Sequence, residues 1–284
     1  MTANGAYQVD VEEVEYLRHG DKPLLARVFK PKGSGPFPLM VSLHGGAWCR
    51  EDRHTDEVIH QQLAKSGVVI ASLDFRMPPD ASYPGSMIDI NYGIRWAKSQ
   101  AKRLGGLPDR VGVMGTSSGG HQAMLSAMRP RDARYASLPL SGGYDATVRC
   151  AVLLWPVIDP LGRYRYAKDL KAKPPYPDIV DRVLPAHDQF WKTEDAMAEG
   201  NPVMALERGE KGEMPPVLYM QGTKDVAHPR PHLDRFVAEY RKAGGQLDLD
   251  LAEGEGSGWI RKPESPNAAP SMAKLIDFVR KHLG

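Results

Sequence analysis

The chain has 284 residues, of which 42% are hydrophobic and 25% charged, and its formal net charge is +2. This composition is that of an ordinary globular protein, and the nearly balanced charge, without a run of lysine or arginine, argues against a nucleic-acid or membrane-surface partner. The two cysteines, Cys49 and Cys150, are too few and too far apart for a disulfide framework or a cysteine-rich metal site.

The amino-terminal segment, residues 1–10, lacks the basic start and apolar core of a secretory signal. No apolar run approaches the ~20 residues that a membrane helix needs. We therefore expect a cytoplasmic protein with no membrane partner.

Short apolar runs alternate with longer amphipathic stretches along the chain. An opening hairpin is predicted over residues 11–19 and 24–31, because apolar and polar residues alternate there. Further strands are predicted over 38–45, 68–75, 110–115, 150–159, 215–222 and 246–254, and helices over 57–67, 87–105, 118–128, 232–245 and 271–283. Repeated strand–helix units predict an α/β fold, with a mainly parallel sheet and helices on both faces. Ligands bind such sheets beyond the carboxyl ends of the strands.

Residues 160–213 break this rhythm, being rich in tyrosine, proline and charge. We interpret them as an inserted cap rather than a linker. The chain is therefore expected to be a single domain, 1–284, with a cap insertion at 160–213.

The strongest chemical signal is the sequence Gly-Thr-Ser-Ser-Gly at 115–119, between a predicted strand and a predicted helix. A sharp strand-to-helix turn exposes its middle residue, Ser117, and the small neighbours let the backbone pass. The helix amino terminus below favours developing negative charge. We predict that Ser117 is a nucleophile; the alternative is a glycine-rich turn with a capping serine.

A second signal is His-Gly-Gly-Ala-Trp at 44–48, directly after a buried strand. Backbone N–H groups of Gly45, Gly46 and Ala47 would hold an oxyanion together with the amide of Ser118. His44 itself is expected to fix this loop rather than to carry a proton.

With these motifs the chain resembles the α/β-hydrolase superfamily. It is most similar to the hormone-sensitive-lipase-like esterases and to the feruloyl-esterase and kynurenine-formamidase groups. The matching segments are 44–48, 73–90, 115–120 and 220–229, in the order in which that superfamily has them. The chain departs from the pattern at Phe75, where a tyrosine is usual, and around Ser117, where Gly-Asp-Ser-Ala-Gly-Gly is usual. The resemblance implies an α/β-hydrolase fold and a serine carboxylic ester hydrolase that needs no metal or other cofactor.

The resemblance also implies an acid after the strand that follows the cap, and Asp225 matches it. A carboxylate there would orient and stabilise an imidazolium. A turn or helix-capping aspartate is the alternative. The family histidine should follow the last strand, but in Gly254-Glu255-Gly256-Ser257-Gly258-Trp259 its position is occupied by Ser257. A serine hydroxyl is not basic near neutral pH.

The site is thus predicted to be either a disarmed variant or one with an unusual base. His228 lies three residues past Asp225 and could swing toward Ser117, although a solvated surface histidine is the simpler interpretation. Glu253 or Glu255 would serve only if burial raised its pKa.

Aromatic side chains are expected to line the substrate pocket, namely Trp48, Trp155 and Trp259. Cap aromatics of the family often line an acyl or aryl pocket, which implies a small-molecule ester substrate, aromatic or short-chain. Arg163, Arg165 and Lys168 could meet a substrate carboxylate, solvated charges being the simpler reading.

Two other functions remain open from the sequence. The plant gibberellin receptors resemble the same esterases and lack the histidine, so a non-catalytic small-molecule-binding protein is one alternative. The other is a lyase or acyl transferase that uses Ser117 on the same scaffold. The sequence leaves the oligomeric state open.

Overall fold

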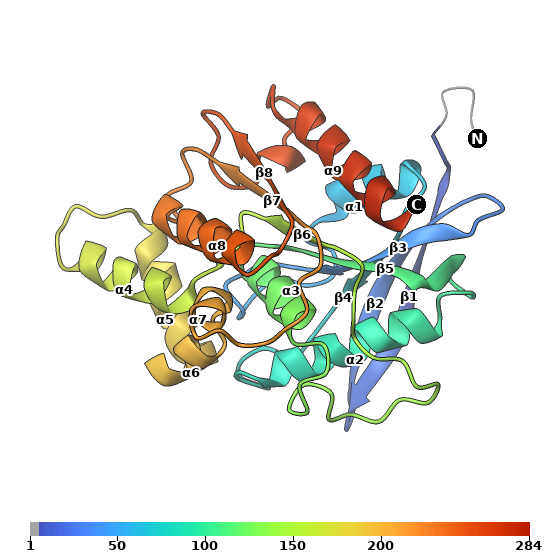
Figure 1. The fold of residues 1–284 in the computed structure, drawn as a ribbon, viewed down its shortest axis with the longest axis horizontal. Helices are drawn as coiled ribbons and strands as arrows, with labels where there is room; N and C mark the ends of the chain where they lie inside the picture. The colour runs from blue at the N-terminus through green and yellow to red at the C-terminus, as the bar shows by residue number, and fades with distance from the viewer. Residues whose placement is uncertain (1–5) are drawn as a thin grey trace.

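One eight-stranded sheet organises the molecule, with the strands in the order β1-β2-β4-β3-β5-β6-β7-β8 (Figure 1). The computed structural model describes residues 6–284, so the first half of the segment weighed as a secretory signal lies outside the described residues. β1 (Val9–His19) and β2 (Lys22–Pro31) form the predicted antiparallel hairpin, and β2 also pairs antiparallel with β4 (Val69–Leu73). The remaining strands are parallel: β3 (Phe37–Leu43), β5 (Gly106–Thr116), β6 (Ala151–Leu154), β7 (Val217–Gly222) and β8 (Leu247–Ala252).

Helices cover both faces of this sheet, as predicted. One face carries α1 (Glu57–Lys65) and α9 (Ala268–Leu283), and the other carries α2 (Gly85–Ser99), α3 (Ser118–Met128) and α8 (Arg230–Lys242). Successive side chains of a strand point to opposite faces. In β3, Leu39 and Val41 accordingly pack in one apolar cluster and Met40 in the other. The predicted α/β class with a mainly parallel sheet is confirmed.

The strand predicted over residues 150–159 is much shorter in the structure, since β6 ends at Leu154. Trp155 has a φ of +38°, which an extended strand cannot accommodate, and Pro156 follows it. The chain therefore turns out of the sheet at this point, and Trp155 is placed at its carboxyl edge.

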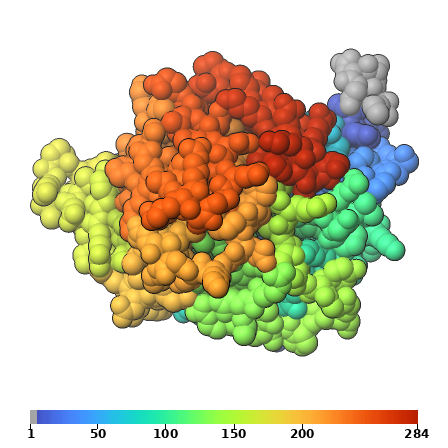
Figure 2. All heavy atoms as spheres, viewed as in Figure 1, coloured from blue at the N-terminus to red at the C-terminus, as the bar shows by residue number. Residues whose placement is uncertain are grey.

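Four short helices lie between β6 and β7: α4 (Pro160–Lys171), α5 (Ile179–Trp191), α6 (Glu194–Glu199) and α7 (Pro202–Glu207). They fall within the segment 160–213, and α4 and α5 project from one end of the molecule, in yellow (Figures 1 and 2). Phe190 and Trp191 of α5 pack on Trp48, which belongs to the loop after β3. This contact fixes the helical segment onto the sheet edge where a ligand is expected.

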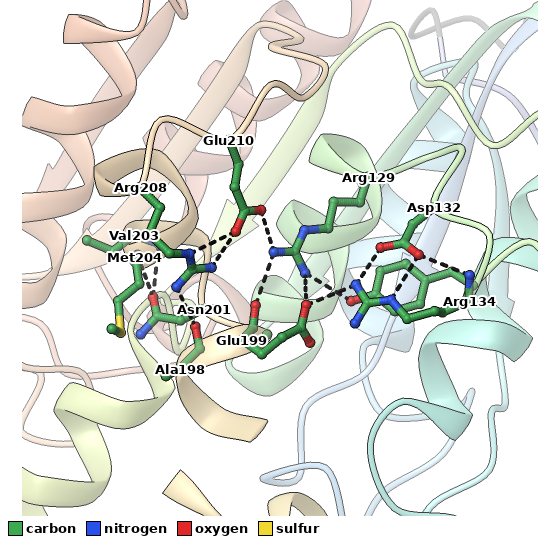
Figure 3. A network of polar contacts seen from close by, with 12 residues as sticks. Arg129, Asp132, Arg134, Ala198, Glu199, Asn201, Val203, Met204, Arg208 and Glu210 are labelled. Atoms are coloured by element: carbon green, nitrogen blue, oxygen red, sulfur yellow. Dashed lines mark hydrogen bonds and ion pairs between the residues drawn. The ribbon is translucent and has the colours of Figure 1, made fainter. Parts of the chain in front are cut away.

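A network of charged side chains joins the same segment to the carboxyl end of α3 (Figure 3). Arg129 donates to Glu199 at 2.7 Å and to Glu210 at 2.6 Å, and Arg134 also donates to Glu199, at 2.9 Å. Partly exposed pairs of this kind contribute little stability one by one. These ion pairs instead help to position the segment, because they link α6 and the chain after α7 to the helix that follows Ser117.

None of the helices within residues 6–284 combines the length and the apolar character needed to cross a membrane.

Candidate active site

Ser117 stands at a sharp turn between β5 and α3. Its backbone has φ 51° and ψ −116°, a conformation that non-glycine residues rarely adopt. Two backbone hydrogen bonds to the end of β6 and the loop after it hold this turn in place. The amide of Ser117 donates to Leu154 O at 3.0 Å, and the carbonyl of Ser117 accepts from Val157 N at 2.9 Å. A Cβ on Gly119 would lie 2.2 Å from the carbonyl oxygen of Leu43, so only glycine fits there. The predicted nucleophile turn is therefore present.

The Ser117 side chain is hydrogen-bonded to a histidine. Ser117 Oγ lies 3.0 Å from His228 Nε2, and His228 Nδ1 lies 2.8 Å from Asp225 Oδ2. A carboxylate only accepts hydrogen bonds, so Nδ1 carries the proton and Nε2 is left to accept the hydroxyl proton of Ser117. The side chains of His228 and Asp225 are 5% and 1% exposed. Serine, histidine and aspartate thus form a continuous, largely buried relay.

The loop between β7 and α8 holds the acid and the histidine together. Asp225 Oδ1 accepts from the amides of Ala227 at 2.9 Å and His228 at 3.1 Å, while its other oxygen receives the imidazole. Gln221 Nε2 donates to the carbonyl of His228 at 2.7 Å. One carboxylate therefore shapes the turn and also orients the ring.

The sequence predicts either a disarmed site or one with an unusual base, and the contact between His228 and Ser117 favours the second. Ser257 does line the same cavity, but it is exposed, and His228 makes the contact that a catalytic base needs. Glu255 is excluded as the substitute base, because hydrogen bonds from Ser265 and Asn267 lower its pKa instead of burial raising it. The sequence feature that indicates His228 as the base is its spacing from Asp225, three residues away on the same loop.

The glycine-rich loop after β3 passes beside Ser117. A Cβ on Gly45 would lie 3.4 Å from Ser117 Cβ. Gly46 and Ala47 follow with φ of +83° and +53°, and all three residues line the cavity. Backbone amides are therefore available next to the place where an oxyanion would form. Ser118 is buried at the start of α3, and its hydroxyl accepts from the amide of Trp48 at 3.1 Å, which ties this loop to the turn.

His44 and His121, two histidines near the site, are structural. His44 is stacked on Phe75 with ring centroids 4.2 Å apart, and burial lowers its pKa to about 4. His121 accepts from Trp48 Nε1 and donates to Gly200 O, and burial again lowers its pKa to about 4. Both rings are neutral at pH 7 and serve to pack and hydrogen-bond the surrounding chain. For His44 this agrees with the expectation that it fixes its loop rather than carrying a proton.

Left-handed backbone concentrates around the site. Within residues 6–284, six non-glycine residues have positive φ, and five of them are Ala47, Trp48, Glu51, Ser117 and Trp155. Four of these five line the cavity, Trp48 being the exception. Such conformations are costly and persist where the surrounding structure enforces them, often at functional sites.

The cavity in front of Ser117 has a volume of about 390 Å³. Its walls come from the turn, the glycine-rich loop, α4 and α5, and the loops after β7 and β8. They are formed by Gly45, Gly46, Ala47, Arg50, Glu51, Thr116, Ser117, Trp155, Arg163, Ile179, Arg182, Val183, Ala227, His228, Ser257, Gly258 and Arg261.

Of the three tryptophans expected to line this cavity, only Trp155 does so. Trp48 and Trp259 are fully buried. Trp48 is stacked on Phe190 with centroids 5.4 Å apart, and Trp259 donates through Nε1 to Ser271 Oγ at 3.0 Å. These two tryptophans belong to the core that supports the cavity, because their partners enclose the whole ring.

The sheet, the nucleophile turn and the glycine-rich loop together define an α/β-hydrolase. The fold matches EstE1, a thermostable carboxylesterase from a metagenomic library, with a TM-score of 0.78 at 21% identity over 100% of this chain and 92% of that one. It also matches an esterase of Pyrobaculum calidifontis, with a TM-score of 0.77 at 20% identity over 96% and 85% of the two chains. The chain belongs to the BD-FAE family, whose model matches residues 27–232.

Two curated relatives come from Mycobacterium tuberculosis. The chain is 27% identical to the esterase LipC over 273 residues, which cover 93% of this chain and 64% of LipC. It is 28% identical to LipM, a probable carboxylic ester hydrolase, over 75% of this chain and 47% of LipM. The chain thus spans about half to two thirds of the length of these relatives.

Proposed function

We propose that the protein hydrolyses carboxylic esters of small molecules, with Ser117 as nucleophile, His228 as proton carrier and Asp225 as orienting acid. The observation that carries this proposal is the unbroken hydrogen-bond series from Ser117 Oγ through His228 to Asp225, at 3.0 and 2.8 Å. The relatives support the reaction class, because those reported above are esterases or ester hydrolases by name.

The chemistry follows from the positions of these groups. Ser117 Oγ attacks the ester carbonyl while His228 Nε2 takes its proton. The negative charge that develops on the carbonyl oxygen is stabilised by backbone amides of Ala47 and Ser118, with Gly46 beside them, and by the amino terminus of α3. His228 then protonates the leaving alkoxide, and a water activated by the same ring releases the acid from Ser117.

The cavity favours a small substrate. A volume of about 390 Å³ is near the lower end of ligand pockets. Trp155 gives it one aromatic wall, and Ile179 and Val183 of α5 give it an aliphatic one. A short-chain or single-ring ester fits these dimensions, with the helices of segment 160–213 acting as the cap over it.

The proposal of a binding protein without catalysis rested on the missing histidine. That argument no longer applies, because Ser117 is hydrogen-bonded to His228, which can accept its proton. Ester hydrolysis is therefore the function that this geometry supports best.

The test is hydrolysis of 4-nitrophenyl acetate and butyrate, combined with labelling by a fluorophosphonate. We expect turnover, and one phosphonyl group added to the intact mass of the protein. Ser117→Ala should lose both. Ser257→Ala is the matched control, since this exposed serine lines the same cavity, whereas the two ring nitrogens of His228 are hydrogen-bonded to Ser117 and Asp225. Labelling that survives in Ser117→Ala would contradict the proposal.

A further inference from the structure

Arg163 is a buried cation on the wall of the catalytic cavity. It lies in the first turns of α4, is 4% exposed, and lines the cavity together with Ser117 and His228. Its Nε and Nη2 atoms are buried and have no hydrogen-bond partner among the described residues. A buried guanidinium is normally paired, because desolvation of an uncompensated charge is costly.

No carboxylate within residues 6–284 forms an ion pair with Arg163. Asp159, one helical turn earlier, is the obvious candidate, but its Oδ2 accepts from Arg235 at 2.9 Å and its Oδ1 from Asn201 at 2.6 Å. Asp225 attracts Arg163 from a distance and is already hydrogen-bonded to His228. Burial lowers the pKa of Arg163 to about 9, so the group is still charged at pH 7.

Unlike Arg163, a neighbouring arginine in the sequence and another in the cavity lining each have a carboxylate partner. Arg165, two residues further along α4, is exposed and donates to Glu194 at 2.7 Å. Arg261, which also lines the cavity, is paired with Asp56 at 2.5 Å. Arg163 instead lies over the ring of Trp48, with 5.3 Å from its guanidinium carbon to the ring centroid. The face of Trp48 holds the cation in place without neutralising it.

The rest of the cavity lining also carries more positive than negative side chains. Arg50 and Arg182 are exposed residues of its lining, and neither forms an ion pair within the described part of the chain. Glu51 is its one acidic lining residue, and burial raises the pKa of Glu51. The cavity therefore presents an excess of positive charge to an entering molecule, which favours the entry of anions.

We propose that the substrate is a small ester that carries a carboxylate, and that Arg163 is the residue that binds this group. The inference rests on the proposed esterase function and adds its substrate class. A second cavity is also lined by Arg163, but its volume of about 10 Å³ is too small for a ligand. The anion must therefore enter from the catalytic cavity, which places it beside Ser117.

The test compares carboxylate esters with neutral esters of nearly the same shape. One pair is 4-nitrophenyl hydrogen glutarate and 4-nitrophenyl methyl glutarate, which places the charge on the acyl side. The other is 4-acetoxybenzoate and methyl 4-acetoxybenzoate, which places it on the alcohol side. We expect kcat/KM of the protein to favour the charged member of at least one pair about tenfold or more, as for a buried charge-assisted hydrogen bond.

Arg163→Gln should lose this preference, so that the ratio of its kcat/KM values for the charged and the neutral member falls toward one. Arg165→Gln is the matched control on the same helix and should keep the preference. Equal rates within both pairs for the unsubstituted protein, or a preference that persists in Arg163→Gln, would overturn the proposal.

Two further measurements keep the outcome decisive. If Arg163→Gln does not fold, competitive inhibition of the unsubstituted protein by glutarate and by benzoate replaces it; inhibition supports the proposal, and its absence overturns it. If the neutral esters are not hydrolysed at all, the esterase function fails on its own, and calorimetric titration with glutarate still tests the carboxylate site.

Discussion

Asp225 and His228 are hydrogen-bonded to each other within a single loop, with 2.8 Å between Asp225 Oδ2 and His228 Nδ1. The same carboxylate accepts two backbone amides of that loop through Oδ1. The proposed acid and the proposed base thus lie on the same segment, between β7 and α8. The loop after β8 contributes Ser257 and Gly258 to the cavity wall but no proton carrier.

Asp225→Asn should lower kcat by about four orders of magnitude, as replacement of the acid does in a well-studied triad. The amide either donates to Nδ1 or leaves it unpaired, so the ring no longer presents an unprotonated Nε2 to Ser117. Asparagine keeps an oxygen for the amides of Ala227 and His228, so the melting temperature should change little. Asp234→Asn is the control, an exposed acid paired with Arg230 at 2.7 Å. Near-normal activity of Asp225→Asn would contradict the role of this acid.

Gly119→Ala should abolish activity and lower stability, because the added methyl group would lie 2.2 Å from Leu43 O and 2.3 Å from His44 O. The backbone of the nucleophile turn would have to move away from β3. Gly256→Ala is the matched control, since a Cβ there meets nothing within 4 Å. Thermal denaturation and esterase assays of both variants check this, and equal behaviour of the two would show that the turn is not tightly packed.

Stability should fall below pH 6.5, because buried histidines are kept neutral in the folded state. Burial lowers the pKa of His60 to about 3, and its Nε2 lies 2.8 Å from Ser42 Oγ. Between pH 6.5 and about 3 the unfolded chain binds a proton there that the folded protein does not. Each such histidine makes stability fall by ~1.4 kcal/mol per pH unit. His60→Gln should reduce the slope of unfolding free energy against pH by this amount in urea denaturation. Parallel slopes for the two proteins would refute it.

Arg163→Met should raise the free energy of unfolding by ~1–3 kcal/mol at pH 7, because it removes a buried cation whose Nε and Nη2 have no partner. The methionine retains an apolar chain to pack on Trp48. Arg165→Met, at an exposed pair, should change stability by less than about 0.5 kcal/mol. Urea denaturation of both variants measures this. A strong loss of stability in Arg163→Met would mean that the cation is structurally required rather than held for a ligand.

The sheet and the nucleophile turn were predictable because their signals are local. Apolar periodicity places the strands, and the glycines around Ser117 mark a sharp strand-to-helix turn. The sequence left the base open between a disarmed site and His228, because the family pattern assigns the histidine to the loop after the last strand. The spacing of Asp225 and His228 carries the necessary information, but only the fold shows that their loop reaches Ser117.

The burial of individual side chains could not be predicted from the sequence either. Trp48 and Trp155 are alike as sequence features, yet one is enclosed by Phe190 and Trp191, some 140 residues away, and the other faces the cavity. Arg163 and Arg165 differ because residues two apart lie on different sides of a helix. The orientation of α4 toward the cavity is set by tertiary packing.

The most direct test of the site is the activity of His228→Gln beside that of Ser257→His. We expect His228→Gln to lose at least about four orders of magnitude in kcat for 4-nitrophenyl acetate, as loss of a triad histidine does elsewhere. Ser257→His should leave the rate of the unsubstituted protein unchanged and should not rescue His228→Gln. Full activity in His228→Gln, or a large gain in Ser257→His, would contradict the assignment of His228 as the base.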